Sequence, residues 1–162
     1  MTRRILPTGL LVAVLASSTV AAFADDGPRY ADGAATFKST CAVCHRPNGA
    51  GTPGLAPPVT VYPPRFVATA QGRRQLAMTV LYGMFGDIVV DDRHYNFKMP
   101  EFAQLDDATL AAVLNHVIFD LGHAPAGAEP LDAASIAAER ANPIDGTAVR
   151  AHRAVAVEGL PP

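Results

Sequence analysis

The sequence Cys41-Ala42-Val43-Cys44-His45 contains both cysteines of this 162-residue chain, with a histidine directly after the second. A CxxCH motif is typical of covalent haem attachment. Two thiols at this spacing can form thioethers with the vinyl groups on one edge of a porphyrin, and the adjacent histidine can bind the iron through an imidazole nitrogen. The single motif therefore predicts one covalently attached haem c, bound through Cys41, Cys44 and His45.

Three other interpretations of the cysteine pair fit the sequence less well. A thioredoxin-like redox motif requires a surrounding βαβ pattern, which the sequence lacks. A zinc site requires further ligands, usually a second CxxC or a pair of histidines at short spacing, and the sequence has neither. A disulfide between Cys41 and Cys44 leaves the adjacent His45 unexplained. We therefore expect the pair to attach haem.

The first 24 residues have the pattern of a secretory signal peptide. Two arginines near the start precede an apolar stretch, and residues 22–24 read Ala-Phe-Ala, which is an A-x-A cleavage site. The apolar stretch is shorter than the roughly 20 residues of a membrane span. We therefore expect residues 1–24 to be removed on export, a periplasmic location, and no stable membrane span in the mature chain.

Cleavage would change the formal net charge from −2 to −4, because two arginines leave and no acidic residue does. This charge does not fit a nucleic-acid or anionic-membrane binder. It fits an acidic protein that is steered toward a basic docking face on a partner, and equally one that is merely soluble. The mature length fits one domain, which we place at residues 25–128, with residues 129–162 forming an extension that packs on the domain or on a partner.

Hydrophobic periodicity predicts an all-α fold with one small β-hairpin. Asp32 is predicted to cap the first helix, in which Gly33 and Phe37 share a face. Residues 46–64, which are rich in proline and glycine, are predicted to form a loop. The predicted helices cover residues 32–40, 72–82, 106–121, 131–141 and 147–155, and the two short strands cover residues 87–90 and 93–97.

A histidine that binds a metal usually donates its other ring nitrogen to an acceptor, which fixes the orientation of the ring. The loop after the motif can supply a prolyl carbonyl for this purpose. We predict that Pro57 accepts this hydrogen bond from His45, with Pro58 as the alternative.

The sixth iron ligand is predicted to be Met99. It precedes a proline and follows an extended segment, so its thioether can reach the distal face of a haem. Met78 and Met84 are expected to pack in the core or at its edge. His94 is the alternative ligand and is otherwise an exposed hairpin residue. The remaining histidines are expected at the surface: His116, His123 and His152. An interface role is open for His116.

These features resemble the class I (mitochondrial-type) cytochrome c family, in its bacterial periplasmic mono-haem branch. The resemblance covers residues 32–122 and implies a cytochrome c fold, with helices wrapped around one covalent haem. His116 departs from the aromatic residue that is usual where the last helix crosses the first. The order of motifs that carries the resemblance is Gly33, Phe37, CAVCH, Pro57-Pro58, and Met99-Pro100 ahead of the last amphipathic helix.

The resemblance implies a non-enzymatic electron carrier. Its expected partners are a periplasmic dehydrogenase, reductase or terminal oxidase, which it would meet as a free carrier or as a subunit of a larger complex. The alternative is a haem enzyme or gas-binding sensor with an open or displaceable sixth iron site. Five side chains are expected to exclude water from the haem: Phe37, Val59, Leu76, Leu81 and Phe102.

Overall fold

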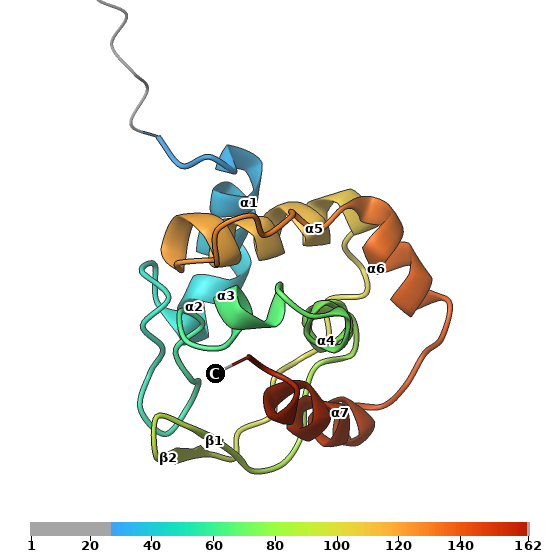
Figure 1. Cartoon of the computed structure of the whole chain (residues 1–162). Coiled ribbons are helices and arrows are strands. Elements are labelled where there is room, and N and C mark those ends of the chain that lie inside the picture. The colour runs from blue at the N-terminus through green and yellow to red at the C-terminus, as the bar shows by residue number, and fades with distance from the viewer. Residues whose placement is uncertain (1–26, 162) are drawn as a thin grey trace, which may run out of the picture.

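A computed structural model of the chain describes residues 27–161 (Figure 1). The predicted signal peptide, residues 1–24, lies outside the described residues. The mostly helical fold with one hairpin is confirmed. The elements are α1 (Ala31–Thr36), η1 (Phe37–Cys41), α2 (Ala42–His45), α3 (Pro63–Phe66), α4 (Ala70–Tyr82), β1 (Ile88–Val90), β2 (Arg93–Tyr95), α5 (Asp107–Asn115), η2 (His116–Leu121), α6 (Ala133–Arg140) and α7 (Gly146–Glu158). The label η denotes a π-helical segment.

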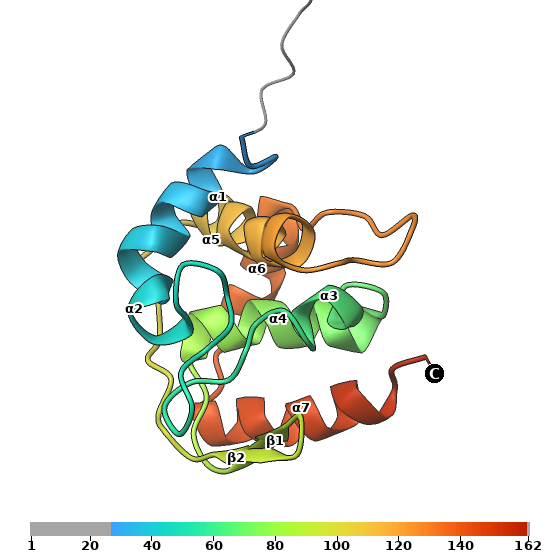
Figure 2. The same cartoon turned by 90° about the vertical axis from the view of Figure 1, so that its left-hand side faces the viewer.

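The first helix crosses α5 at very short distance (Figure 2). Gly33 is buried at the crossing, where a Cβ atom would overlap the backbone carbonyl of Ala112. One turn later, Phe37 is buried against Val113 and Val117. A glycine and an aromatic residue on one helix face therefore let two backbones approach and then fill the space beside them.

The start of α1 is held by a side chain of η2 and not by a side chain of α1 itself. The predicted capping role of Asp32 is wrong: α1 begins one residue earlier, its N-cap is Tyr30, and no side chain caps it locally. Instead the carboxylate of Asp120 accepts hydrogen bonds at 3.1 Å from the backbone N–H groups of Arg29 and Tyr30. A carboxylate from a distant part of the chain thus replaces the local cap and ties α1 to η2.

His116 is buried, so the expectation of a surface position is wrong. The residue is 6% exposed, and its Nδ1 lies 2.8 Å from the carboxylate of Asp120. Its ring meets the ring of Phe37 edge to face, with 5.5 Å between centroids. The histidine therefore takes the place of the aromatic residue at this crossing and satisfies its polar atom through Asp120. His123, by contrast, is exposed as predicted.

The middle of the chain forms α3 and α4, which lie beneath the crossed helices (Figures 1 and 2). The Thr69 hydroxyl caps α4 by accepting from the N–H of Gly72 at 3.0 Å. The predicted loop at residues 46–64 runs into α3, a single turn that begins with two prolines. Proline is tolerated in the first turn of a helix, where its missing N–H costs no hydrogen bond, so its presence did not exclude this turn.

The hairpin forms where the sequence predicts it. In β1 and β2, Ile88 pairs with Tyr95 and Val90 with Arg93. The two turn residues, Asp91 and Asp92, have φ values of 49° and 57°. Two successive residues with positive φ give the tight turn whose twist suits a two-residue hairpin, and aspartate tolerates this conformation better than most residues.

The C-terminal extension packs on the rest of the molecule. Ile136 of α6 and Ala156 of α7 are fully buried in the same core cluster as Leu76 and Leu81 of α4. Figure 2 shows α7 running beneath α4 and beside the hairpin. The extension therefore shares one hydrophobic core with the helices around the cavity.

Two sets of hydrogen bonds fix the chain segment between α5 and α7. The buried Asn115 amide exchanges two hydrogen bonds of 2.8 Å with the backbone of Leu131. The Arg140 guanidinium donates to the Asp107 carboxylate at 2.8 Å and also to two backbone carbonyls ahead of α5. These bonds satisfy the buried Asn115 and the half-buried Arg140 and Asp107, and they fix α6 relative to α5.

Within residues 27–161, no helix has the length and apolar character that a membrane crossing requires.

We expect Gly33→Ala to destabilise the folded protein by about 1–3 kcal/mol, because its methyl group must push the two crossed helices apart. The intrinsic preference of a helix for alanine, about 1 kcal/mol, opposes this and does not offset it. Denaturant titration of the haem-containing protein measures the difference. Gly159→Ala is the matched control, since its Cβ would meet only the Val155 carbonyl at 3.4 Å. Equal stability of Gly33→Ala and wild type would contradict a tight crossing.

We expect Ile136→Ala to cost about 2–5 kcal/mol, because it leaves a cavity in the core that the extension shares with α4 and α5. Ile144→Ala, between α6 and α7, removes the same atoms from an exposed side chain and should change stability by less than about 0.5 kcal/mol. Thermal or denaturant unfolding followed by circular dichroism compares the two variants. Similar values for both would mean that the extension contributes little to the core.

Candidate haem site

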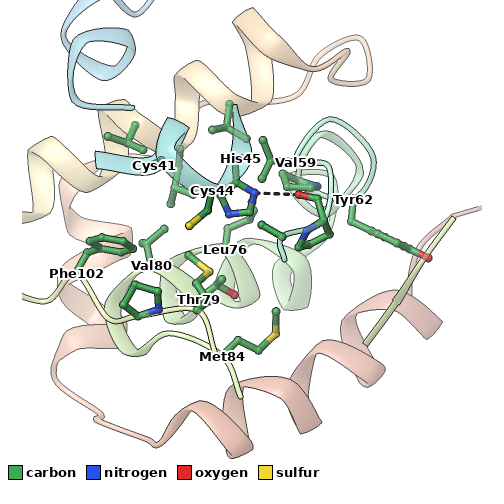
Figure 3. A pocket seen from close by; sticks show the side chains of 18 of the residues that line it. Cys41, Cys44, His45, Val59, Tyr62, Leu76, Thr79, Val80, Met84 and Phe102 are labelled. Carbon is green, nitrogen blue, oxygen red and sulfur yellow. Dashed lines mark hydrogen bonds between the residues drawn. The ribbon is translucent and has the colours of Figure 1, made fainter. Parts of the chain in front are cut away.

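One cavity with mostly apolar walls brings together the predicted site residues from separate parts of the chain (Figure 3). The attachment motif lies on one wall, the proline loop on a second, and the segment after the hairpin on a third. Residues Cys41, Cys44, His45, Pro57 and Met99 all line it. The fold therefore builds a single site out of pieces that are far apart in the sequence.

The ring of His45 is oriented by the loop that follows it. Its Nδ1 lies 2.9 Å from the carbonyl oxygen of Pro57, whereas Pro58 makes no such bond to it. A carbonyl oxygen can only accept, so Nδ1 carries the proton and Nε2 keeps a free lone pair. Burial lowers the pKa of His45, although the bond to Pro57 opposes this shift. The imidazole is therefore neutral at neutral pH, which is the form that binds a metal.

Two further bonds fix the end of α2 against the same loop. The Thr52 hydroxyl donates to the carbonyl of Cys44 at 2.9 Å, and the N–H of Gly51 donates to the carbonyl of His45 at 2.9 Å. The last carbonyls of a helix have no partner within the helix. The loop supplies those partners and so ties the motif to the segment that carries the Pro57 carbonyl.

Cys41 and Cys44 are free, half-buried thiols at the edge of the cavity. Burial, and to a lesser extent the neighbouring Cys44, raises the pKa of Cys41 to about 11. A thiol with such a pKa is protonated at neutral pH and reacts slowly as a nucleophile. This environment differs from that of a redox-active CxxC pair, whose first thiol has a lowered pKa.

Two methionines reach the cavity side by side. Met84 and Met99 form an isolated antiparallel bridge through backbone hydrogen bonds of 3.2 and 3.0 Å, and both line the cavity. The bridge depends on Gly83, which ends α4 with φ at 69° and where a Cβ atom would overlap the Met99 carbonyl. Met78 is buried within α4 and is not part of the cavity wall.

His94 lies outside the cavity. Its imidazole is on the exposed side of the hairpin, with Nδ1 2.8 Å from the carboxylate of Asp87, and its side chain is 72% exposed. The structure thus brings Met99 into the site and leaves the alternative ligand at the surface.

The cavity walls are mostly apolar, as the sequence predicts. Phe37, Val59, Leu76 and Phe102 line it, whereas Leu81 points into the main core. Several other lining residues have no local signal in the sequence, because their positions depend on tertiary packing. These are Tyr62 of the loop, Thr79 and Val80 of α4, Met84 after α4, and Arg153 of α7.

Residues 30–118 match the family model for cytochrome c. The chain belongs to the cytochrome c family. It is 41% identical over 113 residues to cytochrome c-552 of Thermus thermophilus, an alignment that covers 68% of this chain and 86% of that protein. A second cytochrome c-552 of the same species has the same identity to this chain, with 76% of its length covered.

Membership of this family, together with Cys41 and Cys44, makes the chain an electron carrier with one covalent haem c, as predicted. The cavity fits this group. Two free thiols lie at its edge, a neutral imidazole has one nitrogen free, thioethers lie in the wall, and most other lining atoms are apolar. When bound, haem supplies one-electron chemistry between ferric and ferrous iron, and the protein sets its orientation, ligands and polarity.

We expect the double variant Cys41→Ala/Cys44→Ala to lose covalent haem. Acidified organic solvent should extract haem from this variant and not from wild type, because no thioether remains. Each single variant is the matched control and should retain haem through one bond, with a stepwise shift of the pyridine haemochrome band. Haem that stays with the double variant after extraction would contradict attachment at these two positions.

Proposed function

We propose that this protein is an exported, periplasmic mono-haem electron carrier in which His45 and Met99 are the two axial ligands of the iron. Its partners would be a donor and an acceptor among periplasmic dehydrogenases, reductases and terminal oxidases. The observation that carries the proposal is the presence of His45, with a free Nε2, and Met99 in the wall of one apolar cavity.

The geometry supports a rigid ligand pair. His45 is held by Pro57, and the backbone of Met99 is held by its bridge to Met84, while Pro100 restricts the chain after it. Ligands that keep their position in both oxidation states reduce the reorganisation that accompanies electron transfer. A thioether ligand also raises the reduction potential relative to a second histidine.

The apolar wall of the cavity also raises the reduction potential. Phe37, Leu76, Val80 and Phe102 exclude water from the space around the iron. Low polarity disfavours the additional positive charge of ferric iron and so raises the potential. No substrate pocket beyond the haem is needed for this function.

The exposed edge of the site supports transient contact with a protein partner. Val43 of the attachment motif is 81% exposed and Phe97 is 61% exposed, and both lie at the cavity. Apolar side chains at the rim can be covered briefly by a partner without strong binding, which suits a carrier that must dissociate after each transfer. The acidic net charge of the mature chain would favour a partner with a basic docking face.

The predicted export is part of the same proposal. The A-x-A cleavage site at residues 22–24 ends the apolar N-terminal stretch, and c-type cytochromes receive their covalent haem outside the cytoplasm. Mass spectrometry of the protein purified from the periplasmic fraction would test this, because the mature chain should begin at Asp25 and carry one haem.

We expect Met99→Ala to convert the oxidised protein from a low-spin to a high-spin spectrum, with loss of the methionine–iron charge-transfer band. The reduced variant should bind carbon monoxide, and its reduction potential should fall by on the order of 0.1 V or more, within the roughly 0.8 V that axial ligands span. Optical spectroscopy and redox titration measure these changes.

Met84→Ala is the matched control, since Met84 lines the same cavity and should leave the band and the spin state unchanged. If Met84→Ala removes the band and Met99→Ala does not, the ligand is Met84. If wild type itself is high-spin and binds carbon monoxide, the sixth position is open and the protein is a haem enzyme or gas sensor.

A further inference from the structure

The C-terminal extension contributes a cation to the haem cavity. Arg153 lies in α7, beyond the residues 30–118 that match the family model, yet it lines the same cavity as Cys41 and His45. It is the only described residue after position 117 in the cavity wall. The position of a charged side chain in a mostly apolar wall needs a physical explanation.

Arg153 has no carboxylate partner among the described residues. Its guanidinium carbon lies 4.6 Å from the centroid of the Tyr62 ring, and its Nη2 lies 3.4 Å from the carbonyl of Val89. Burial lowers the pKa of Arg153, which reflects the cost of holding this charge away from water. A partly buried cation of this kind is stabilised by an anion that the protein itself does not supply.

The other described residues of the cavity wall do not supply a carboxylate that could pair with Arg153. None of the described lining residues is Asp or Glu, whereas two, Lys98 and Arg153, are cationic. Lys98 is likewise without a carboxylate partner in the part of the chain that the structure describes, and its Nζ lies 4.3 Å from the centroid of the Phe85 ring. Lys98 is exposed, so water solvates its charge, whereas Arg153 is the partly buried cation of the described wall.

Haem carries two propionates on the edge of the porphyrin opposite the vinyl groups. Because Cys41 and Cys44 fix the vinyl edge, the propionates must lie on the far side of the cavity. Figure 3 shows Tyr62 on the side away from Cys41, and Tyr62 is the residue against which Arg153 stacks. The cation therefore lies on the side of the cavity where the carboxylates are required.

We infer that Arg153 binds a haem propionate, so that α7 of the extension completes the cofactor site. The inference rests on the proposed haem attachment at Cys41 and Cys44. An arginine suits this role because its planar guanidinium can donate two parallel hydrogen bonds to one carboxylate. Stacking on Tyr62 holds the guanidinium plane, and the free N–H groups remain available for the carboxylate.

The consequence is a high, pH-independent reduction potential. An ionised propionate stabilises ferric iron, and a paired cation offsets that effect. Without Arg153 the potential should be lower wherever the propionate is ionised. The propionate pKa should also rise toward neutral pH, because a partly buried carboxylate without a cation favours its protonated form. The potential of such a variant would then fall as pH rises through that pKa.

The test compares Arg153→Gln with Arg150→Gln in the full-length mature holocytochrome. Arg150 lies on the same helix and does not line the cavity, so both variants lose one positive charge from α7. Redox titration between pH 5 and 8 should show that Arg153→Gln lowers the equilibrium constant for reduction at pH 8 about tenfold, or about 59 mV for a one-electron couple. It should also introduce a pH dependence that wild type and Arg150→Gln lack. Arg153→Lys should restore most of the potential.

Other titratable groups near the site are common to all variants and cancel in the comparison. Tyr62, Tyr95 and Lys98 line the cavity, and His152 precedes Arg153 but is bound to two glutamines of α4, at 2.8 and 2.9 Å. If Arg153→Gln and Arg150→Gln have equal potentials and equal pH profiles, Arg153 serves only the packing of α7 and the inference is wrong.

A measurement on wild type keeps the inference testable if Arg153→Gln fails to accumulate. Proton NMR of the haem propionate methylene groups reports their ionisation directly, and at least one propionate should remain ionised without titrating between pH 5 and 8. Titration of both propionates near neutral pH would overturn the inference. The methionine–iron band tests the proposed ligation separately, since its absence from wild type would refute Met99 and leave the comparison of arginine variants unaffected.

Discussion

The close crossing of α1 over α5 is the constraint on which the site depends. Because Gly33 lets the first helix rest on the Ala112 carbonyl, Phe37 enters the core one turn later and the attachment motif emerges at the edge of the cavity. The carboxylate of Asp120 then fixes the start of that helix through two backbone N–H groups. A helix positioned at its start and at its crossing has little freedom left at its end, which is where a covalent attachment requires accuracy.

Under the proposed ligation, the structure positions the two iron ligands in different ways. On one side, the carbonyl of Pro57 accepts a hydrogen bond from His45, and further bonds from the same loop hold the end of α2. On the other, Met99 is placed by backbone pairing with Met84, which Gly83 permits. Neither arrangement needs a long regular element. Both use hydrogen bonds to backbone groups of short segments, so the proposed ligands can be held at a helix end and in a loop.

Local patterns in the sequence predicted most of the helices, the hairpin and the attachment motif, because amphipathic spacing, turn residues and CxxCH act over a few positions. Predictions failed where a distant partner decides the outcome. Asp32 resembles a cap, yet Asp120 performs that role from another helix. His116 is polar, yet it is buried because Asp120 satisfies it and Phe37 packs against it. No local signal indicated that Arg153 would reach the cavity, since this depends on how α7 packs against α4.

The extension illustrates how a cofactor site can grow beyond the part of a chain that matches its family. Helices α6 and α7 pack on the rest of the chain through hydrophobic burial, since Ile136, Val149 and Ala156 are completely buried. Once α7 lies against α4, Arg153 on its cavity side reaches the wall beside Tyr62. A hydrophobic residue there would only add to the wall, whereas an arginine adds a charge whose desolvation cost must be offset by an anion. Under the proposed haem attachment the cofactor brings that anion with it, so the packing of the extension and the binding of the haem would stabilise one another.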